Sequence, residues 1–216
     1  MHGTAQRQAK PVSIEMLLQL AKPRKDLVPL RDLRDRVLLV VGFAGGFRRS
    51  ELAQLTPQSL SFTPQGVHVT LKRSKTDQLG KGRVVALPPG PRPMCPVNLL
   101  KTWLLVLRKA DPAGAAKPLF RRVDRYGKIG SGLRGAAVGT ILRRRMSMCG
   151  LEGNGFSAHS LRSGLVTAAA RAGVPTWLIQ RQTGHRSEGT VHRYIRGVSL
   201  FVQNAFTGAS VASRTK

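Results

Sequence analysis

The last third of the chain contains the stretch HSLRSGLVTAAARAGVPTWLIQRQTGHRSEGTVHRYIR, which is residues 159–196. Glycine and proline divide this stretch into short segments. The predicted helices cover about 159–172, 175–182 and 187–195. Gly173 closes the first helix, and Pro175 stands in the first turn of the second, where its missing N–H costs no helical hydrogen bond.

Three groups in this stretch carry charged or reactive side chains: His159-Ser160-Leu161-Arg162, Gly184-His185 and His192-Arg193-Tyr194-Ile195-Arg196. On a helix, His159 and Arg162 are three residues apart and share a face, so one phosphate could meet an imidazole and a guanidinium together. A single His-x-x-Arg is more often a capping histidine beside a solvated arginine. Spacing alone therefore leaves the site open, and the rest of the chain has to decide it.

The first part of the chain predicts two helices. Ser13 is a typical N-cap for a short helix that Pro23 ends. A longer helix follows, in which apolar residues recur at helical spacing, namely Leu30, Leu33, Val37, Leu38 and Val41. Gly45-Gly46 ends this helix just before the sequence Phe47-Arg48-Arg49-Ser50-Glu51-Leu52.

Between Ser61 and Pro88 the period changes to two, which is typical of strands. Gly66–Leu71 and Arg83–Leu87 are predicted to form strands of a small antiparallel sheet. The connection between them is a basic loop that could lie against phosphates. Its cations are Lys72, Arg73, Lys75 and Lys81.

Helices resume at Pro96. A helix over about 97–110 places Trp103 on its apolar face, where a core role is favoured over ligand binding. Residues 111–132 are predicted to be a long loop around a short strand at 119–123. A helix over about 134–149 carries the run Arg143-Arg144-Arg145. Together these elements predict an α+β architecture that is mainly helical and contains one small sheet.

The charge of the chain indicates the class of its partner. The 216 residues include 36 Lys and Arg against 10 Asp and Glu, a formal net charge of +26, which is more than solubility requires. A membrane partner would need an amphipathic basic helix, a lipidation signal or a long apolar run, and the sequence has none of these. Nucleic acid is therefore the expected partner, with a merely soluble basic surface or an RNA-binding protein as alternatives.

The two cysteines, Cys95 and Cys149, lack the spacing of a metal site and are too few for a disulfide framework. A reducing compartment is therefore expected, and zinc is not.

Taken together, the motifs resemble those of the phage-integrase or tyrosine-recombinase family, along nearly the whole chain and in the family's order. Residues 46–52 resemble the first arginine motif, residues 159–164 the second motif and residues 181–185 the third. Tyr194 follows His185 by nine residues, which is the family's spacing. The implied fold is the α+β catalytic domain of this family, mainly α-helical with a small antiparallel three-stranded sheet.

The resemblance also implies the site residues. Six are expected to be catalytic: Arg48, Lys75, His159, Arg162, His185 and the nucleophile Tyr194. Glu51 is the expected buried partner of Arg48, and Lys72 and Lys81 are rivals of Lys75. The other tyrosine, Tyr126, has no histidine nearby in sequence and is expected at the surface or on DNA.

The implied activity is site-specific DNA recombination, either integration or excision, through a 3′-phosphotyrosine intermediate. Attack on a phosphodiester places further negative charge on its non-bridging oxygens, which Arg48 and Arg162 can neutralise bidentately where other enzymes use Mg²⁺. The phenol of Tyr194, with an ordinary pKa of about 10, needs help to attack, either from a nearby base, for which His159 is the candidate, or from its cationic surroundings. Lys75 can protonate the leaving 5′ oxygen, and His185 can hydrogen-bond a non-bridging oxygen. No metal and no cofactor is therefore expected.

The catalytic domain is predicted over 13–197, between an irregular segment, 1–12, and a tail, 198–216. Members of the family usually carry an additional N-terminal helical domain that grips DNA, and this sequence is expected to lack it, with weak and strongly salt-dependent DNA binding as a result. The tail has an apolar face that could pack in cis or on a neighbouring copy, formed by Leu200, Phe201, Val202 and Phe206. A monomer is expected in solution and a tetramer on double-stranded DNA. The protein is expected to be bacterial or phage-derived and to act in the cytoplasm, associated with the nucleoid.

Basic residues of the loop and of the helix at 134–149 are the expected phosphate contacts: Lys72, Arg73, Lys81, Arg143, Arg144 and Arg145. Two other functions remain open at this point. One is a type IB topoisomerase-like enzyme, which shares the chemistry but rejoins the same strand. The other is a non-catalytic DNA-binding module or decayed integrase remnant, in which Tyr194 is idle and no covalent product forms.

Overall fold

The computed structural model describes residues 9–71, 82–185 and 189. Its α-helices are α1 (Ile14–Ala21), α2 (Pro29–Ala44), α3 (Arg49–Gln54), α4 (Pro96–Ala110), α5 (Gly135–Met148), α6 (His159–Arg171) and α7 (Thr176–Thr183). Its strands are β1 (Leu60–Thr63), β2 (Gly66–Leu71), β3 (Arg83–Leu87), β4 (Arg121–Val123) and β5 (Ile129–Gly132). Two short 3₁₀ turns, η1 (Pro57–Ser59) and η2 (Gly114–Ala116), complete the described elements. The predicted α+β, mainly helical fold is confirmed.

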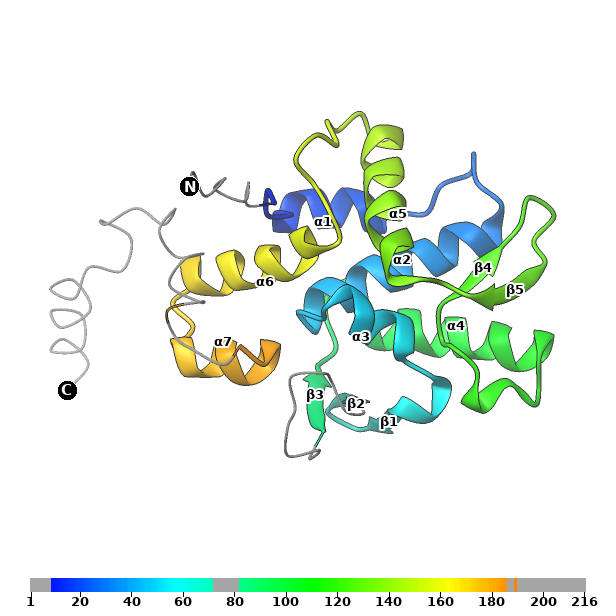
Figure 1. The fold of residues 1–216 in the computed structure, drawn as a ribbon, viewed down its shortest axis with the longest axis horizontal. Coiled ribbons are helices and arrows are strands. Elements are labelled where there is room, and N and C mark those ends of the chain that lie inside the picture. Colours follow the sequence, from blue (N-terminus) through cyan, green and yellow to red (C-terminus); the bar gives the residue numbers. More distant parts are fainter. Residues whose placement is uncertain (1–8, 72–81, 186–188, 190–216) are drawn as a thin grey trace, which may run out of the picture.

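Helix α2 is the centre of the molecule. It packs against α1, α4, α5 and α6, and Figure 1 shows it between α6 and α7 at one end and the β4–β5 hairpin at the other. Its apolar residues from Val37 to Val41 are almost completely buried. The helix begins with Pro29, whose ring favours the first turn of a helix. This central position puts the carboxyl end of α2 next to the segment that carries Arg48.

The three-stranded sheet has the order β1-β2-β3 and is antiparallel throughout. Val67, Val69 and Leu71 are buried at alternate positions of β2, while His68 and Thr70 between them are exposed, as expected for a half-buried sheet. The period of two in the sequence therefore located β2 and β3 correctly.

A second sheet, formed by β4 and β5, was not predicted as a pair. The short strand expected at 119–123 exists only from Arg121 onward, and it pairs with β5 in the segment that was predicted as loop. Leu119 and Phe120 are instead buried in the core. The indole N–H of Trp103 donates to the carbonyl of Leu119 at 2.8 Å, so Trp103 is a core residue, as predicted.

The helix predicted after Ser13 and the two predicted between 159 and 182 also agree with the structure. Ser13 caps α1 by accepting a hydrogen bond from the backbone N–H of Met16 at 3.2 Å. Helices α6 and α7 correspond to the predictions over 159–172 and 175–182. The third helix, predicted over 187–195, lies outside the described residues.

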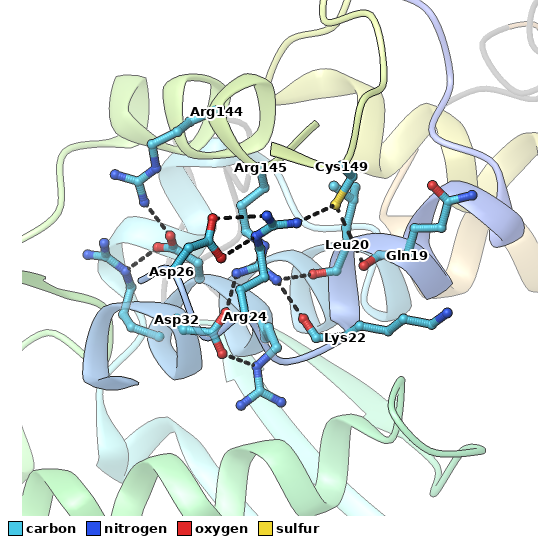
Figure 2. Close-up of polar contacts among 12 residues, drawn as sticks. Gln19, Leu20, Lys22, Arg24, Asp26, Asp32, Arg144, Arg145 and Cys149 are labelled. Carbon is cyan, nitrogen blue, oxygen red and sulfur yellow. Dashed lines mark hydrogen bonds and ion pairs between the residues drawn. The ribbon is translucent and has the colours of Figure 1, made fainter. Parts of the chain in front are cut away.

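A buried ionic cluster joins α2 to α5 and to the end of α1. Figure 2 shows Arg145 of α5 directed at Asp32 of α2 and at the carbonyl oxygens of Leu20 and Lys22. These three hydrogen bonds measure 2.5, 2.7 and 2.9 Å, and the Arg145 side chain is 0% exposed. The prediction that Arg145 contacts phosphate was therefore wrong, because the folded chain already encloses and neutralises its guanidinium.

The neighbours of Arg145 differ from it. Arg144 pairs with the buried Asp35 but keeps 37% of its side chain exposed. Arg143 is exposed and donates to the carbonyl of Phe156 at 3.2 Å. Both remain predicted phosphate contacts.

None of the helices in the described part of the chain has the length and apolar character of a membrane span.

Candidate active site

The candidate site lies where the amino ends of α3 and α6 meet the carboxyl end of α7. Arg48 is the N-cap of α3, His159 begins α6, Arg162 follows one turn later, and His185 follows α7. Arg48 is more than 100 positions away in sequence from the other three residues. The fold brings all four together, as the resemblance implied.

Close packing of α6 on the core sets the direction of His159 and Arg162. Gly164 lies against the backbone of Val12 and the ring of Phe43, and a Cβ there would stand 2.3 Å from the Val12 carbonyl oxygen. The backbone N–H of Val12 donates to the carbonyl of Ser160 at 3.0 Å. A glycine at 164 therefore allows the approach that holds the first turns of α6 in place.

Arg48 and Glu51 form a capping pair at the start of α3. The Glu51 carboxylate accepts from the backbone N–H of Arg48 at 2.7 Å through Oε2, and from Arg48 Nη1 at 2.8 Å through Oε1. Glu51 is 8% exposed and Arg48 is 36% exposed. The second guanidinium nitrogen of Arg48 donates to the carbonyl of Gly184 at 3.1 Å. Glu51 thus occupies the position expected for the buried partner, and Arg48 spans from α3 to the end of α7.

Arg162 is almost completely buried, with 2% of its surface exposed. Its Nη1 donates to the carbonyl oxygens of Gly46 and Thr183 at 2.7 and 2.6 Å. Its Nε donates to Nε2 of His185 at 3.3 Å. Backbone carbonyls from two different segments therefore orient this guanidinium toward the site.

His185 takes part in a directed chain of hydrogen bonds. Because Nε2 accepts from Arg162, the hydrogen of the neutral ring is on Nδ1, which then donates to Thr183 Oγ1 at 2.7 Å. The Thr183 hydroxyl in turn donates to the carbonyl of Ile179 at 2.6 Å. In this arrangement Nε2 is an acceptor, so the donor role predicted for His185 requires the other tautomer and stays a prediction.

Both histidines of the site are held neutral by their surroundings. Burial, followed by the charges of Arg162 and Arg48, lowers the pKa of His185 from 6.5 to about 3. The same causes, in the same order, lower the pKa of His159. A neutral imidazole has a lone pair that can accept a proton, which is what a general base needs.

An open pocket of about 300 Å³ lies between the start of α3 and the start of α6. Its lining includes Arg48, Arg49, Ser50 and His159. Arg49 and Ser50 are exposed. The pocket therefore offers an anion direct access to Arg48 and His159.

The sequence-based prediction missed one residue of this region, Arg83, which begins β3. Its guanidinium donates to Glu51 Oε2 at 3.3 Å and to the carbonyl of Gln182 at 2.9 Å. Burial lowers the pKa of Arg83 from its ordinary value. The only signal in the sequence was an arginine at the first position of the predicted strand, next to a loop already rich in cations.

The sequence model of the phage integrase family matches residues 12–198 of the chain. The chain belongs to this family. An integrase/recombinase XerD homologue of Selenomonas ruminantium is 40% identical over 206 residues, which is 94% of this chain and 58% of the relative. Tyrosine recombinase XerD of Corynebacterium glutamicum is 26% identical over 193 residues, which is 89% of this chain and 58% of the relative. The chain thus spans little more than half the length of the curated relatives it matches.

Solved structures show the same fold. XerH site-specific recombinase, bound to a palindromic difH substrate in a post-cleavage complex, matches with a TM-score of 0.69 at 22% identity, over 94% of this chain and 52% of XerH. A lambda integrase dimer bound to a COC′ core site matches with a TM-score of 0.62 at 15% identity, over 91% of this chain and 51% of the integrase chain.

Of the residues expected to be catalytic in this phage integrase family member, Lys75 and Tyr194 lie outside the described residues, and so do Lys72, Arg73 and Lys81. Their roles stay predictions. Tyr126, the alternative tyrosine, lies between β4 and β5 and is 79% exposed. Figure 1 shows the β4–β5 hairpin at the opposite end of the molecule from α7. Within the described ranges, no three His, Cys, Asp or Glu side chains gather in a group that could hold a metal ion.

Proposed function

We propose that this member of the phage integrase family cuts and rejoins double-stranded DNA at specific sites, through a covalent link between Tyr194 and the 3′ phosphate. The observation that carries the proposal is the convergence of Arg48, His159, Arg162 and His185 on one region with an open pocket. The family match and the DNA complexes of its structural neighbours support the same substrate. The proposed DNA substrate lies in the nucleoid of the cell. We therefore expect the protein to act in the cytoplasm.

The proposed chemistry is phosphoryl transfer between oxygen atoms. The Tyr194 oxygen attacks phosphorus, the bond to the 5′ oxygen breaks, and the negative charge that builds on the non-bridging oxygens is stabilised by Arg48 and Arg162. His159, whose lowered pKa keeps it neutral, accepts the phenolic proton. Lys75 gives a proton to the leaving 5′ oxygen. The reverse reaction, with a 5′ hydroxyl from another strand, completes the exchange without an external energy source.

We infer that assembly into a tetramer accompanies strand exchange on DNA. An apolar groove of about 480 Å³ runs between α1, α6, α7 and the segment before α4. Ile14, Val174 and Leu178 are among the residues that line it. The predicted apolar face of the tail, at Leu200, Phe201, Val202 and Phe206, matches this groove in chemistry. A tail from a neighbouring copy is the proposed occupant, and the protein without DNA is expected to be a monomer.

The test is covalent trapping. The protein is incubated in EDTA with a nicked suicide substrate that contains a candidate attachment site of the source element, and SDS-resistant protein–DNA adducts are measured. Tyr194→Phe is expected to abolish the adduct, whereas the matched variant Tyr126→Phe, which alters an exposed tyrosine between β4 and β5, is expected to keep it. DNA binding without any adduct would instead favour the non-catalytic module.

The same assay separates the remaining alternatives. Relaxation of a supercoiled plasmid without exchange between two sites would favour the topoisomerase-like activity. For the lysine, replacing the bridging 5′ oxygen by sulfur removes the need for a proton donor, because a thiolate is a good leaving group. Lys75→Met is expected to be slow on the oxygen substrate, and its rate is expected to be restored on the sulfur substrate. Lys72→Met and Lys81→Met are not expected to show this pattern of slowing and rescue.

A further inference from the structure

We propose that Arg83 is a positioning residue for the proposed strand cleavage: it holds Glu51 and the carboxyl end of α7 together, so that Arg48 and His185 keep their relative placement. The inference rests on the proposed function for its kinetic part. Arg83 was not among the residues that the motifs implied, and it has no place in the chemical steps described above.

The first observation is a closed ring of contacts. Arg83 donates to Glu51 Oε2 at 3.3 Å and to the carbonyl of Gln182 at 2.9 Å. Glu51 receives Arg48 through its other oxygen at 2.8 Å, and Arg48 reaches the carbonyl of Gly184 at 3.1 Å. The short backbone path from Gln182 to Gly184 completes the ring. The Arg83 side chain therefore joins α3 to the carboxyl end of α7, as the Arg48 side chain also does.

The second observation is the close packing of the Arg83 guanidinium on Gly184. A Cβ on Gly184 would lie 2.5 Å from Arg83 Nη1. Gly184 also has φ +70, a conformation that favours glycine. This glycine therefore ends α7, makes room for Arg83 and directly precedes His185. The position of the guanidinium is thus linked to the backbone that carries the imidazole.

The third observation is that Glu51 serves two arginines at once. Its Oε2 accepts from the backbone N–H of Arg48 at 2.7 Å and from Arg83. Glu51 is 8% exposed and Arg83 is 21% exposed. A buried carboxylate with two cationic partners has a defined orientation. Loss of Arg83 leaves Glu51 with Arg48 alone, which gives the pair freedom to move and leaves the Gln182 carbonyl without its donor.

Arg121 offers a matched control. It begins a strand, β4, as Arg83 begins β3. It is 13% exposed, pairs with Asp111 at 2.8 Å and donates to the carbonyl of Gly130 at 2.8 Å. Its contacts have the same chemistry as those of Arg83, one carboxylate and one carbonyl, but Asp111 follows α4 and Gly130 lies in β5, so neither partner belongs to the candidate site. Arg121→Ala therefore measures the general cost of losing such an arginine.

The experiment compares Arg83→Ala, Arg83→Lys and Arg121→Ala in the full chain. Adduct formation at saturating suicide substrate, the apparent Kd for DNA, and the thermal midpoint are measured for each. Arg83→Ala is expected to slow adduct formation by about 10- to 100-fold, the range that a small displacement of reacting groups produces, with little change in Kd. Arg83→Lys is expected to recover only part, because one ammonium cannot replace a forked pair of donors.

Amide hydrogen exchange gives a readout that does not depend on activity. The Arg48 amide, which donates to Glu51, is expected to exchange faster in Arg83→Ala than in Arg121→Ala at equal global stability. Equal rates of adduct formation in the two alanine variants would overturn the kinetic part of the inference, and unchanged protection of the Arg48 amide would overturn its structural part. A wild-type protein that forms no adduct at all would refute the proposed function, while the exchange of the Arg48 amide would still decide whether Arg83 positions Glu51.

Discussion

Arg145 and Arg162 show how one residue type acquires two roles in this molecule. Both lie on helices, both are almost completely buried, and each donates to two backbone carbonyls. Arg145 also pairs with the Asp32 carboxylate at 2.5 Å, whereas Arg162 also donates to the neutral imidazole of His185. The Asp32 carboxylate neutralises the charge of the Arg145 guanidinium. The carbonyl and imidazole groups that accept from Arg162 are neutral, so they orient its guanidinium without removing its charge. The difference teaches that the partner, more than burial, separates a structural arginine from one suited to an anionic substrate.

The largest expected effect comes from removing the structural arginine of this comparison, Arg145. Arg145→Ala removes a side chain that is 0% exposed, leaves two carbonyls without its donors and leaves Asp32 with Arg36 alone. It is expected to lower the free energy of unfolding by about 3–5 kcal/mol. Chemical denaturation measures this loss. The neighbouring variant Arg144→Ala serves as the control, since Arg144 is 37% exposed and Asp35 keeps Arg34 as a partner, and about 1 kcal/mol or less is expected for it. Similar losses for both would contradict the distinction.

Arg162→Ala tests the other side. Removing one donor to a developing oxyanion costs about 10²- to 10³-fold in rate, and we expect adduct formation at saturating DNA to fall by this amount. Circular dichroism and the thermal midpoint should show a folded protein. If Arg162→Ala unfolded the chain and left the rate of the remaining folded fraction unchanged, Arg162 would belong with Arg145.

The two histidines predict how stability depends on pH. Burial and nearby guanidinium groups place the folded pKa of His185 at about 3 and also lower that of His159, both below the ordinary 6.5. The unfolded chain therefore binds protons that the folded chain does not, so stability is fully present above about pH 6.5 and declines as the pH falls below it. The free energy of unfolding measured between pH 8 and pH 4 should decline less in His185→Gln than in the wild type. Parallel curves would show that His185 is not held neutral.

The smallest effect concerns the exposed member of the arginine run. If Arg143 contacts a DNA phosphate, Arg143→Gln should reduce the slope of log K against log salt by about 0.9, with no change in the unfolding midpoint. A titration of DNA binding at several salt concentrations measures the slope. An unchanged slope would remove Arg143 from the predicted interface and leave its bond to the Phe156 carbonyl as its only assigned contact.

Local patterns predicted much of this fold. The period of two located β2 and β3, Ser13 marked the start of α1, and Gly173 with Pro175 separated α6 from α7. The β4–β5 hairpin was missed as a pair because β5 contains Ile129 and two glycines and so carries little strand pattern. Its pairing is instead set by the partner strand and by the packing of Leu119 and Phe120 beside it.

For the candidate site, the sequence by itself determined which motifs are present and the family to which they point. Only the tertiary structure decided what each arginine does. Arg143, Arg144 and Arg145 are adjacent and identical in type, but Arg145 meets Asp32, 113 residues away, and Arg83 meets Glu51 and Gln182 on separate elements. Burial and charge pairing arise from contacts between segments distant in sequence, so a local pattern does not contain them. For this reason Arg145 was assigned to DNA from its sequence, and Arg83 was not assigned at all.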